Sequence, residues 1–193
     1  LAAKADHPEA LLAGERNGLR ITAAQTGGTE FDLGNSPREY TTGAITGRTI
    51  IITTTNGTRA LRACANAQQI LVASFLNLHA TTDQLRADPP GNLAIVCGGT
   101  HEEAALEDIL AAGAIAKTLS DLYGPDADDD ATQTARLLFE TLGQDLEAAM
   151  PLTRNGRRLL SQPELAGDVA ACTKLNLYDL VAGMESGLVR RHS

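Results

Sequence analysis

Aromatic side chains and cysteines are scarce in this sequence. Phe, Tyr and Trp make up 3% of the 193 residues and Trp is absent, so Ala, Leu and Ile must fill the core. The three cysteines, Cys64, Cys97 and Cys172, lie far apart and form no Cys-x-x-Cys pair. This usage predicts reduced, mostly buried thiols in a cytoplasmic protein. None of them begins a Cys-x5-Arg loop, so a catalytic cysteine is kept only as an alternative.

Positive charge and long apolar runs are also lacking. The chain has 16 Lys and Arg against 24 Asp and Glu, a net charge of −8 and a pI of about 4.9. A non-specific nucleic-acid binder needs a basic face, so we expect no nucleic-acid partner. No apolar run approaches the roughly 18 residues of a membrane span, and no charged-then-apolar leader opens the chain. We therefore expect no membrane partner and leave a homo-oligomer open.

Strands and helices are predicted to alternate through the middle of the chain. The expected strands are residues 49–53, 70–74 and 93–97, and the expected helices are residues 58–67, 78–87 and a segment after Gly99. This order predicts an α/β fold: a mostly parallel sheet flanked by helices, with a helical C-terminal portion at about residues 126–175. We expect one domain over residues 1–193. Residues 93–97 and 49–53 lack alternation, which is typical of strands buried on both faces.

The remaining segments are less regular. The chain opens as a helix that ends in a short strand at Leu11-Leu12, followed by a turn at residues 14–18 and a short strand at 19–22. Residues 23–47 form a long loop, of a size that is functional or disordered in most proteins. Residues 176–189 are mixed and compatible with an edge strand.

Small polar residues fill the junction between the strand at 49–53 and the following helix. They are Thr54, Thr55, Asn56, Gly57 and Thr58, followed by Arg59. A helix N-terminus offers free N–H groups and favours anions, and an Asn-Gly pair lets the backbone approach a ligand. Arg59 adds a fork for an oxyanion. Anion binding and simple capping by Thr58 both remain open.

Carboxylates gather after the glycine turn that follows Cys97. They are Glu102, Glu103, Glu107 and Asp108. One interpretation is structural, because Thr100 and Glu103 have the spacing of a capping box and acidic residues suit a first helical turn. The other is a Mg²⁺ site, because this ion takes one or two carboxylates together with phosphate oxygens. The acidic stretch at residues 126–130 lacks the Gly and Glu of a calcium loop, and we interpret it as a solvated turn and helix cap.

The long loop contains a rigid turn at Asn35-Ser36-Pro37. Pro37 fixes its own φ and holds Ser36 extended, which displays the Asn35 amide and the Ser36 hydroxyl. We expect this loop to fold over the strand ends and face residues 55–59. The alternative is an Asx-type turn that caps a short helix at residues 37–40. The four histidines have no metal-ligand spacing and are expected to be structural or exposed.

Together these segments resemble the 2-phosphosulfolactate phosphatase family of the coenzyme M pathway. The resemblance runs from about residue 11 to residue 178 and rests on LAGERNG (12–18), FDLGNSPREY (31–40), TTNGTRAL (54–61), SFLN (74–77), LED (106–108) and GRRLL (156–160). The first three segments are highly specific in combination. Members of the family usually open with a further strand, so the resemblance implies that this chain lacks that first strand.

The resemblance implies a Mg²⁺-dependent phosphatase with its own α/β fold. Its substrate would be a small anionic phosphoester, 2-phosphosulfolactate, which gives sulfolactate and phosphate. The implied catalytic residues are Asn35, Ser36, Asn56, Glu107 and Asp108; the implied substrate-binding residues are Arg16, Thr54, Thr55, Gly57, Thr58 and Arg59; the implied metal ligands are Glu15, Glu107 and Asp108. The alternative is a non-catalytic relative that only binds anions.

Overall fold

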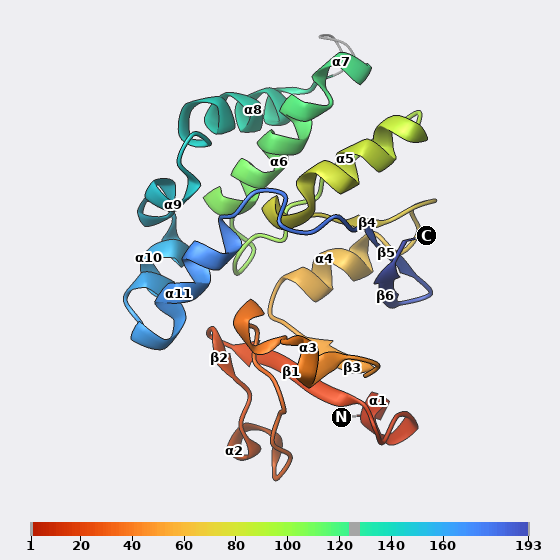
Figure 1. Ribbon diagram of the computed structural model, residues 1–193, viewed down its shortest axis with the longest axis vertical. Coiled ribbons are helices and arrows are strands. Elements are labelled where there is room, and N and C mark those ends of the chain that lie inside the picture. The colour runs from red at the N-terminus through yellow and green to blue at the C-terminus, as the bar shows by residue number, and fades with distance from the viewer. Residues whose placement is uncertain (1, 124–127, 193) are drawn as a thin grey trace. The chain divides into compact units, whose positions relative to one another are not determined.

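The computed structural model describes residues 2–123 and 128–192 (Figure 1). The chain divides into two compact units, Leu1–Arg59 and Ala60–Ser193, each with its own hydrophobic core. The mixture of helices and strands confirms an α/β protein. Whether the two units form one domain stays a prediction.

A small mixed sheet organises the first unit. Its elements are α1 (Ala2–Asp6), β1 (Leu11–Arg16), β2 (Leu19–Arg20), α2 (Ala23–Thr26), the 3-10 helix η1 (Pro37–Glu39), α3 (Thr42–Ile45) and β3 (Ile50–Thr53), and α4 (Gly57–Ala63) begins here. The strand order is β2-β1-β3. Leu12, Ile21 and Phe31 form the core, with Ile51 packed against them.

The first two strands form a tight hairpin. Strand β1 runs on to Arg16 and pairs antiparallel with β2 through Glu15↔Arg20 and Arg16↔Leu19. Only Asn17 and Gly18 lie between the strands, with φ of 57° and 82°. Positive φ at both positions is typical of the two-residue hairpin turn that Asn-Gly favours. The turn predicted at residues 14–18 is therefore shorter, because the strand takes up its first half.

Parallel pairing brings three chain segments together at the other side of β1. Strand β3 pairs with β1 from Leu11↔Ile50 to Gly14↔Thr53, and Leu33 forms a parallel bridge with Ala13. The predicted strand at residues 49–53 is thus confirmed within a residue. It is not buried on both faces, however, because Ile52 is 47% exposed. The predicted long loop contains α2, η1 and α3 as short helical turns.

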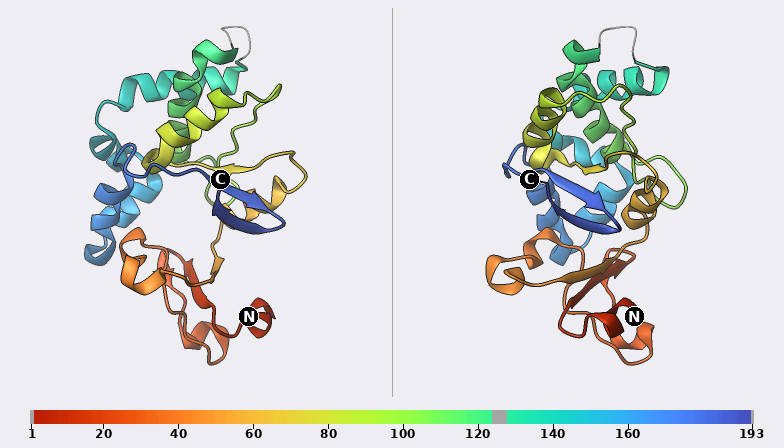
Figure 2. Two further views of the ribbon diagram at one scale, coloured as in Figure 1. Left: turned by 45° about the vertical axis from the view of Figure 1, so that its right-hand side comes forward. Right: turned by 90° about the vertical axis from the view of Figure 1, so that its right-hand side faces the viewer.

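Helices dominate the second unit (Figure 2). After α4 come β4 (Leu71–Val72), the 3-10 helix η2 (Phe75–Asn77), α5 (Leu78–Ala87), α6 (Leu106–Thr118), α7 (Ser120–Tyr123), α8 (Asp130–Leu142), α9 (Leu146–Ala149), the 3-10 helix η3 (Met150–Leu152), α10 (Arg154–Leu160), α11 (Pro163–Cys172), β5 (Ala182–Glu185) and β6 (Leu188–Arg191). Helix α6 lies against α5 and α8, and its Leu110 and Ala114 are fully buried in the core. The C-terminal portion is helical through α8 to α11.

The second sheet is antiparallel, with strand order β4-β5-β6. A mostly parallel sheet is therefore not observed: among the described residues, parallel pairing is confined to β1 with β3 and Leu33. Residues 93–97 form no strand, which corrects the prediction. Their apolar run suggested burial, but Leu93 and Val96 are 37% and 55% exposed, and no neighbouring strand pairs with them within the part of the chain that is described.

Within residues 2–123 and 128–192, no helix is both long enough and apolar enough to cross a bilayer.

Candidate active site

Candidate residues of the first unit lie at one edge of its sheet. Since β1, β3 and Leu33 run parallel, the residues that follow their paired positions lie at the same end of the sheet. Glu15 follows Gly14, Thr54 follows Thr53, and Gly34 follows Leu33. Gly14 permits this close pairing, because a Cβ there would lie 2.3 Å from the Thr53 carbonyl oxygen. Ligands of open α/β sheets bind at such carboxyl ends.

Both oxygens of the Glu15 carboxylate accept hydrogen bonds. Its Oε1 accepts from the backbone N–H and the hydroxyl of Thr55, each at 2.9 Å, and its Oε2 accepts from the Gly18 N–H at 2.9 Å. The residue is 9% exposed. Burial opposes ionisation and is the largest single influence, but the bonds from Gly18 and Thr55 and the Arg16 charge outweigh it, so the pKa of Glu15 lies below its usual value.

The loop after β3 uses several of its donors internally. Thr54 Oγ1 accepts from the Thr58 N–H at 3.2 Å, and Thr58 Oγ1 donates to the Thr54 carbonyl at 3.1 Å. The Arg59 N–H donates to the Asn56 carbonyl at 3.0 Å. These bonds account for the start of α4. Anion binding by Thr54, Thr55, Asn56, Gly57, Thr58 and Arg59 stays a prediction.

The Asn35-Ser36-Pro37 turn begins at the same sheet edge. Pro37–Glu39 forms the 3-10 helix η1, as the capping alternative expected, but Ser36 makes no side-chain cap bond. Glu39 Oε2 accepts from the Gly34 N–H and Tyr40 Oη donates to the Gly34 carbonyl, both at 2.9 Å. Asn35 is exposed and Ser36 is buried. Their catalytic roles, and the predicted approach to residues 55–59, stay predictions.

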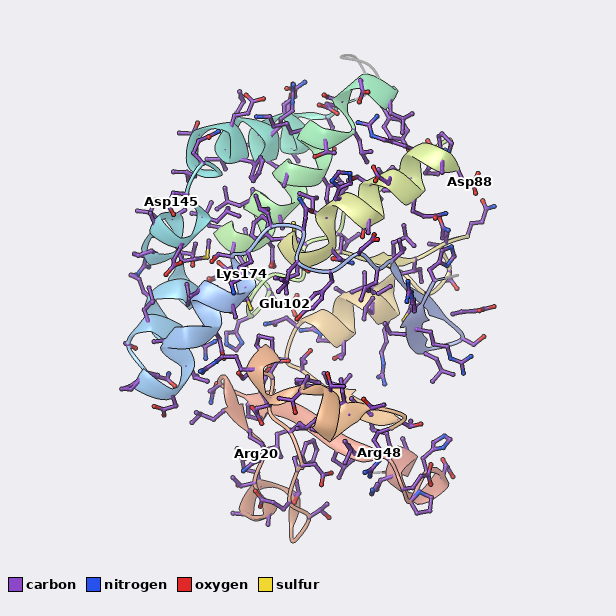
Figure 3. All side chains as sticks on the ribbon, viewed as in Figure 1. Arg20, Arg48, Asp88, Glu102, Asp145 and Lys174 are labelled. Atoms are coloured by element: carbon purple, nitrogen blue, oxygen red, sulfur yellow. The ribbon has the colours of Figure 1, made fainter. Side chains whose placement is uncertain are left out.

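Two arginines flank this edge. Arg16 donates from its guanidinium to the Glu15 carbonyl at 2.7 Å, and its predicted role as a substrate clamp is untested. Arg20, labelled in Figure 3, lies on β2 and donates to the Asp32 carbonyl at 3.2 Å.

The second unit contains the glycine turn and its carboxylates. Thr100 and Glu103 exchange backbone hydrogen bonds of 2.9 and 3.1 Å, and the two residues between them, His101 and Glu102, have φ of 51° and 65°. Glu102 is labelled in Figure 3 in this loop. The segment is a tight turn, and α6 begins later, at Leu106, with Ala105 as its N-cap. The suggested capping box of Thr100 and Glu103 is therefore wrong.

Asp108 closes the glycine turn onto α6. Its Oδ2 accepts from the Gly99 N–H at 2.7 Å. Burial is the main cause that raises the pKa of Asp108; the Gly99 hydrogen bond opposes it and the Glu107 charge adds to it. Glu107 and Asp108 thus form a pair of neighbouring carboxyl groups in the first turn of α6.

Glu107 is held on one side only. Its Oε1 accepts from Asn155 Nδ2, which also donates to Thr100 Oγ1 at 2.7 Å. Its Oε2 is buried and has no hydrogen-bond partner among the described residues. A buried acceptor without a donor is a position that a bound water or an ion can satisfy.

Residues of α10 complete this region, and the sequence reasoning missed them. Thr153, Arg154, Asn155 and Arg157 line a cavity of about 260 Å³ together with Glu107. Arg154 forms an ion pair with Glu103 and donates to the Thr100 carbonyl at 3.1 Å. The one signal in the sequence was Gly156, which the resemblance marked only as a helix start.

Mg²⁺ takes oxygen donors in a near-octahedral arrangement. The described part of the chain holds no group of three or more His, Cys, Asp or Glu side chains that could bind a metal. Mg²⁺ needs only one or two carboxylates when phosphate and water complete its shell. Glu107, whose buried Oε2 has no partner among the described residues, can supply one such carboxylate, and Asp108 follows it in the first turn of α6. Glu15, whose two oxygens are filled, fits Mg²⁺ less well.

Part of the acidic stretch at residues 126–130 caps a helix. Asp129 caps α8 by accepting from the Thr132 N–H at 2.8 Å, as the helix-cap interpretation of the acidic stretch expected, while residues 126 and 127 lie outside the described residues.

All three cysteines are free, but Cys97 and Cys172 are exposed, so the prediction of mostly buried thiols is wrong.

Comparison with known proteins identifies the class. The family model described as 2-phosphosulpholactate phosphatase matches residues 1–187. The chain therefore belongs to the 2-phosphosulfolactate phosphatase family, which confirms the resemblance found in the sequence.

Individual relatives carry the same name. The chain is 37% identical over 188 residues to a probable 2-phosphosulfolactate phosphatase of Deinococcus radiodurans, covering 97% of this chain and 74% of that protein. It is 35% identical over 185 residues to the corresponding protein of Caldanaerobacter subterraneus subsp. tengcongensis, covering 96% and 73%. The protein of that name from Thermotoga maritima is 36% identical over 180 residues, covering 92% and 72%.

Proposed function

We propose that this protein is a Mg²⁺-dependent phosphatase that hydrolyses 2-phosphosulfolactate to sulfolactate and phosphate. Membership of the family supports the reaction. The observation that carries the metal assignment is the buried Glu107 Oε2, which lacks a partner among the described residues, beside the Asp108 carboxyl group.

Glu107 and Asp108 would hold the ion in the second unit. Bound there, Mg²⁺ would neutralise charge on the phosphoryl oxygens of the substrate. Asp108 is tied to the Gly99 N–H and Glu107 to Asn155, so both carboxylates are oriented before the substrate arrives. Phosphoryl transfer depends mainly on positioning and charge stabilisation, and such preorganisation supplies part of both.

Within the first unit, residues 54–59 are proposed to bind an anion. Strand β3 and Leu33 both pair in parallel with β1, so this loop begins at the carboxyl ends of parallel segments. The N-terminus of α4 favours the anionic groups of the substrate, although the hydroxyls of Thr55 and Thr58 already bond within the protein. Arg16 and Arg59 are proposed as additional cationic groups, and Asn35, Ser36 and Asn56 as polar contacts.

A small, diffusible, multiply charged substrate also agrees with the composition. With a net charge of −8, we propose that the protein acts in the cytoplasm without a nucleic-acid partner.

The test is release of inorganic phosphate from synthetic 2-phosphosulfolactate. We expect turnover with Mg²⁺, loss of turnover with EDTA and recovery when Mg²⁺ is restored. Phospholactate, which lacks the sulfonate, serves as the matched substrate and is expected to react more slowly. Binding of the substrate without phosphate release from any phosphoester would instead support the non-catalytic alternative.

A further inference from the structure

The start of α10 is fixed in position by its own sequence. Thr153 is 1% exposed, and its Oγ1 accepts from the Gly156 N–H at 2.8 Å, which caps the helix. Gly156 is buried, and a Cβ there would lie 2.1 Å from the Met150 carbonyl oxygen. Only glycine permits this approach. Asn155 directly precedes Gly156, so its backbone is well determined.

The Asn155 amide joins two segments that meet at the start of α6. Its Nδ2 donates to Thr100 Oγ1 at 2.7 Å and to Glu107 Oε1, so both of its N–H groups are used. The orientation of the amide is determined, because an ionised carboxylate only accepts hydrogen bonds and the opposite orientation would set the Asn155 carbonyl against Glu107. The interaction links residues 48 positions apart.

This bond removes a freedom that Glu107 would otherwise have. The terminal torsion of a Glu side chain is broad, so an untethered carboxylate exchanges its two oxygens readily. With Oε1 held by Asn155, the oxygen without a partner in the described structure is Oε2. Arg154, the residue before Asn155, is engaged by Glu103 and the Thr100 carbonyl.

We propose that Asn155 is a positioning residue that holds Glu107 with Oε2 presented to a divalent cation. This inference rests on the proposed function for the identity of the cation. Thr100 helps to hold Asn155 in place, because its hydroxyl oxygen accepts a hydrogen bond from the other N–H of the same amide. Residues that orient a metal ligand typically change metal affinity by about 10–100-fold when they are removed.

The experiment is a double-mutant cycle read by Mn²⁺ affinity, measured by calorimetry on metal-free protein. Asn155→Ala is expected to weaken Mn²⁺ binding by about 10-fold or more, and Glu107→Gln by at least as much. In the Glu107→Gln background, Asn155→Ala should have almost no further effect, because the group it orients is already lost. Asn92→Ala, in an exposed turn of the same unit, is the matched control and should bind Mn²⁺ as the unmodified protein does.

Several results would overturn the inference: unchanged affinity in Asn155→Ala, effects of the two substitutions that simply add, or no Mn²⁺ binding by the unmodified protein. If Asn155→Ala does not fold, Thr100→Val keeps the shape of the site, removes only the hydroxyl and should weaken Mn²⁺ binding by a smaller factor. An unchanged affinity in that variant counts against the inference.

Failure of the proposed function gives a different pattern. Mn²⁺ binding without phosphate release overturns the phosphatase assignment while the cycle still decides the role of Asn155. Phosphate release with equal Mn²⁺ affinity in the unmodified protein and in Asn155→Ala overturns the positioning role alone. In the active protein, Asn155→Ala should also raise the Mg²⁺ concentration needed for half-maximal activity, whereas a purely structural role would lower thermal stability without that shift.

Discussion

Glu15 is buried and Glu107 is half-buried with one buried oxygen, and the hydrogen bonds that they receive differ. Glu15 receives three hydrogen bonds, from Gly18 and Thr55, and both of its oxygens are engaged. Glu107 receives one, from Asn155, and its second oxygen is buried without a donor among the described residues. Burial alone therefore does not mark a functional carboxylate. A filled carboxylate stabilises the fold, while one with an open acceptor is available to a ligand.

The local structures explain this difference. Glu15 stands just before the Asn17-Gly18 hairpin, so the Gly18 N–H turns back towards it, and the neighbouring parallel strand delivers Thr55. Glu107 stands in the first turn of α6, whose free N–H groups point along the helix axis rather than towards its side chain. Among residues 2–123 and 128–192, the donor that reaches it comes from another helix and is Asn155.

The largest expected effect is on catalysis. Glu107→Gln removes the charge of the unfilled carboxylate, and kcat for 2-phosphosulfolactate should fall about 100-fold or more. Phosphate release at saturating substrate and Mg²⁺ measures it. If the variant is as active as the unmodified protein, Glu107 has no role in the reaction, and the distinction between a structural Glu15 and a functional Glu107 fails.

The next effect is on stability. Glu15→Gln sets an amide N–H₂ against N–H donors and leaves one of them unsatisfied, which should lower the free energy of unfolding by about 1–3 kcal/mol. Urea denaturation at neutral pH measures this loss, with Glu9→Gln, an exposed residue of the same unit, as the control. Mn²⁺ affinity should not change. Weaker Mn²⁺ binding with unchanged stability would instead make Glu15 a metal ligand, as the sequence predicted.

The two sites should also respond to pH with opposite signs. Because the pKa of Glu15 is lowered from 4.5, its contribution is present above that value and is lost as the pH falls through the folded-state pKa. The pKa of Asp108 is raised from 3.8, so the folded state binds its proton more tightly and stability falls as the pH rises through that window.

Thermal unfolding of metal-free protein across the acid range tests these signs. Asp108→Asn should raise Tm at neutral pH, by less than Glu15→Gln lowers it, and the gain should vanish in acid. The loss in Glu15→Gln should also shrink in acid. Parallel Tm curves for both variants would refute the assignment of opposite shifts.

The smallest effect is expected at the Glu103–Arg154 ion pair. The two side chains are 67% and 49% exposed, so water and salt screen the pair. Glu103→Gln should change the free energy of unfolding by about 0–1 kcal/mol, and the change should disappear in high salt. A loss as large as that of Glu15→Gln would mean that the exposure of a charged group does not predict its contribution to the free energy of unfolding.

Local patterns predicted much of the secondary structure. The helix at residues 78–87 is observed as α5 with the same bounds, and the β-branched run at 49–53 is observed as β3 within one residue. The strand expected at residues 93–97 failed, because an apolar run forms a strand only if another strand pairs with it. The expected capping box failed because α6 begins at Leu106, beyond Thr100 and Glu103.

The sequence by itself determined the family, through motifs such as TTNGTRAL and FDLGNSPREY, and it singled out Glu15, Glu107 and Asp108 as carboxylates of interest. The tertiary structure decided which of their oxygens are filled. The donors come from residues distant in the chain, Thr55 at 40 positions from Glu15 and Asn155 at 48 from Glu107. Spacing cannot show such pairs, because the geometry of a hydrogen bond is set within about 3 Å by packing between separate elements.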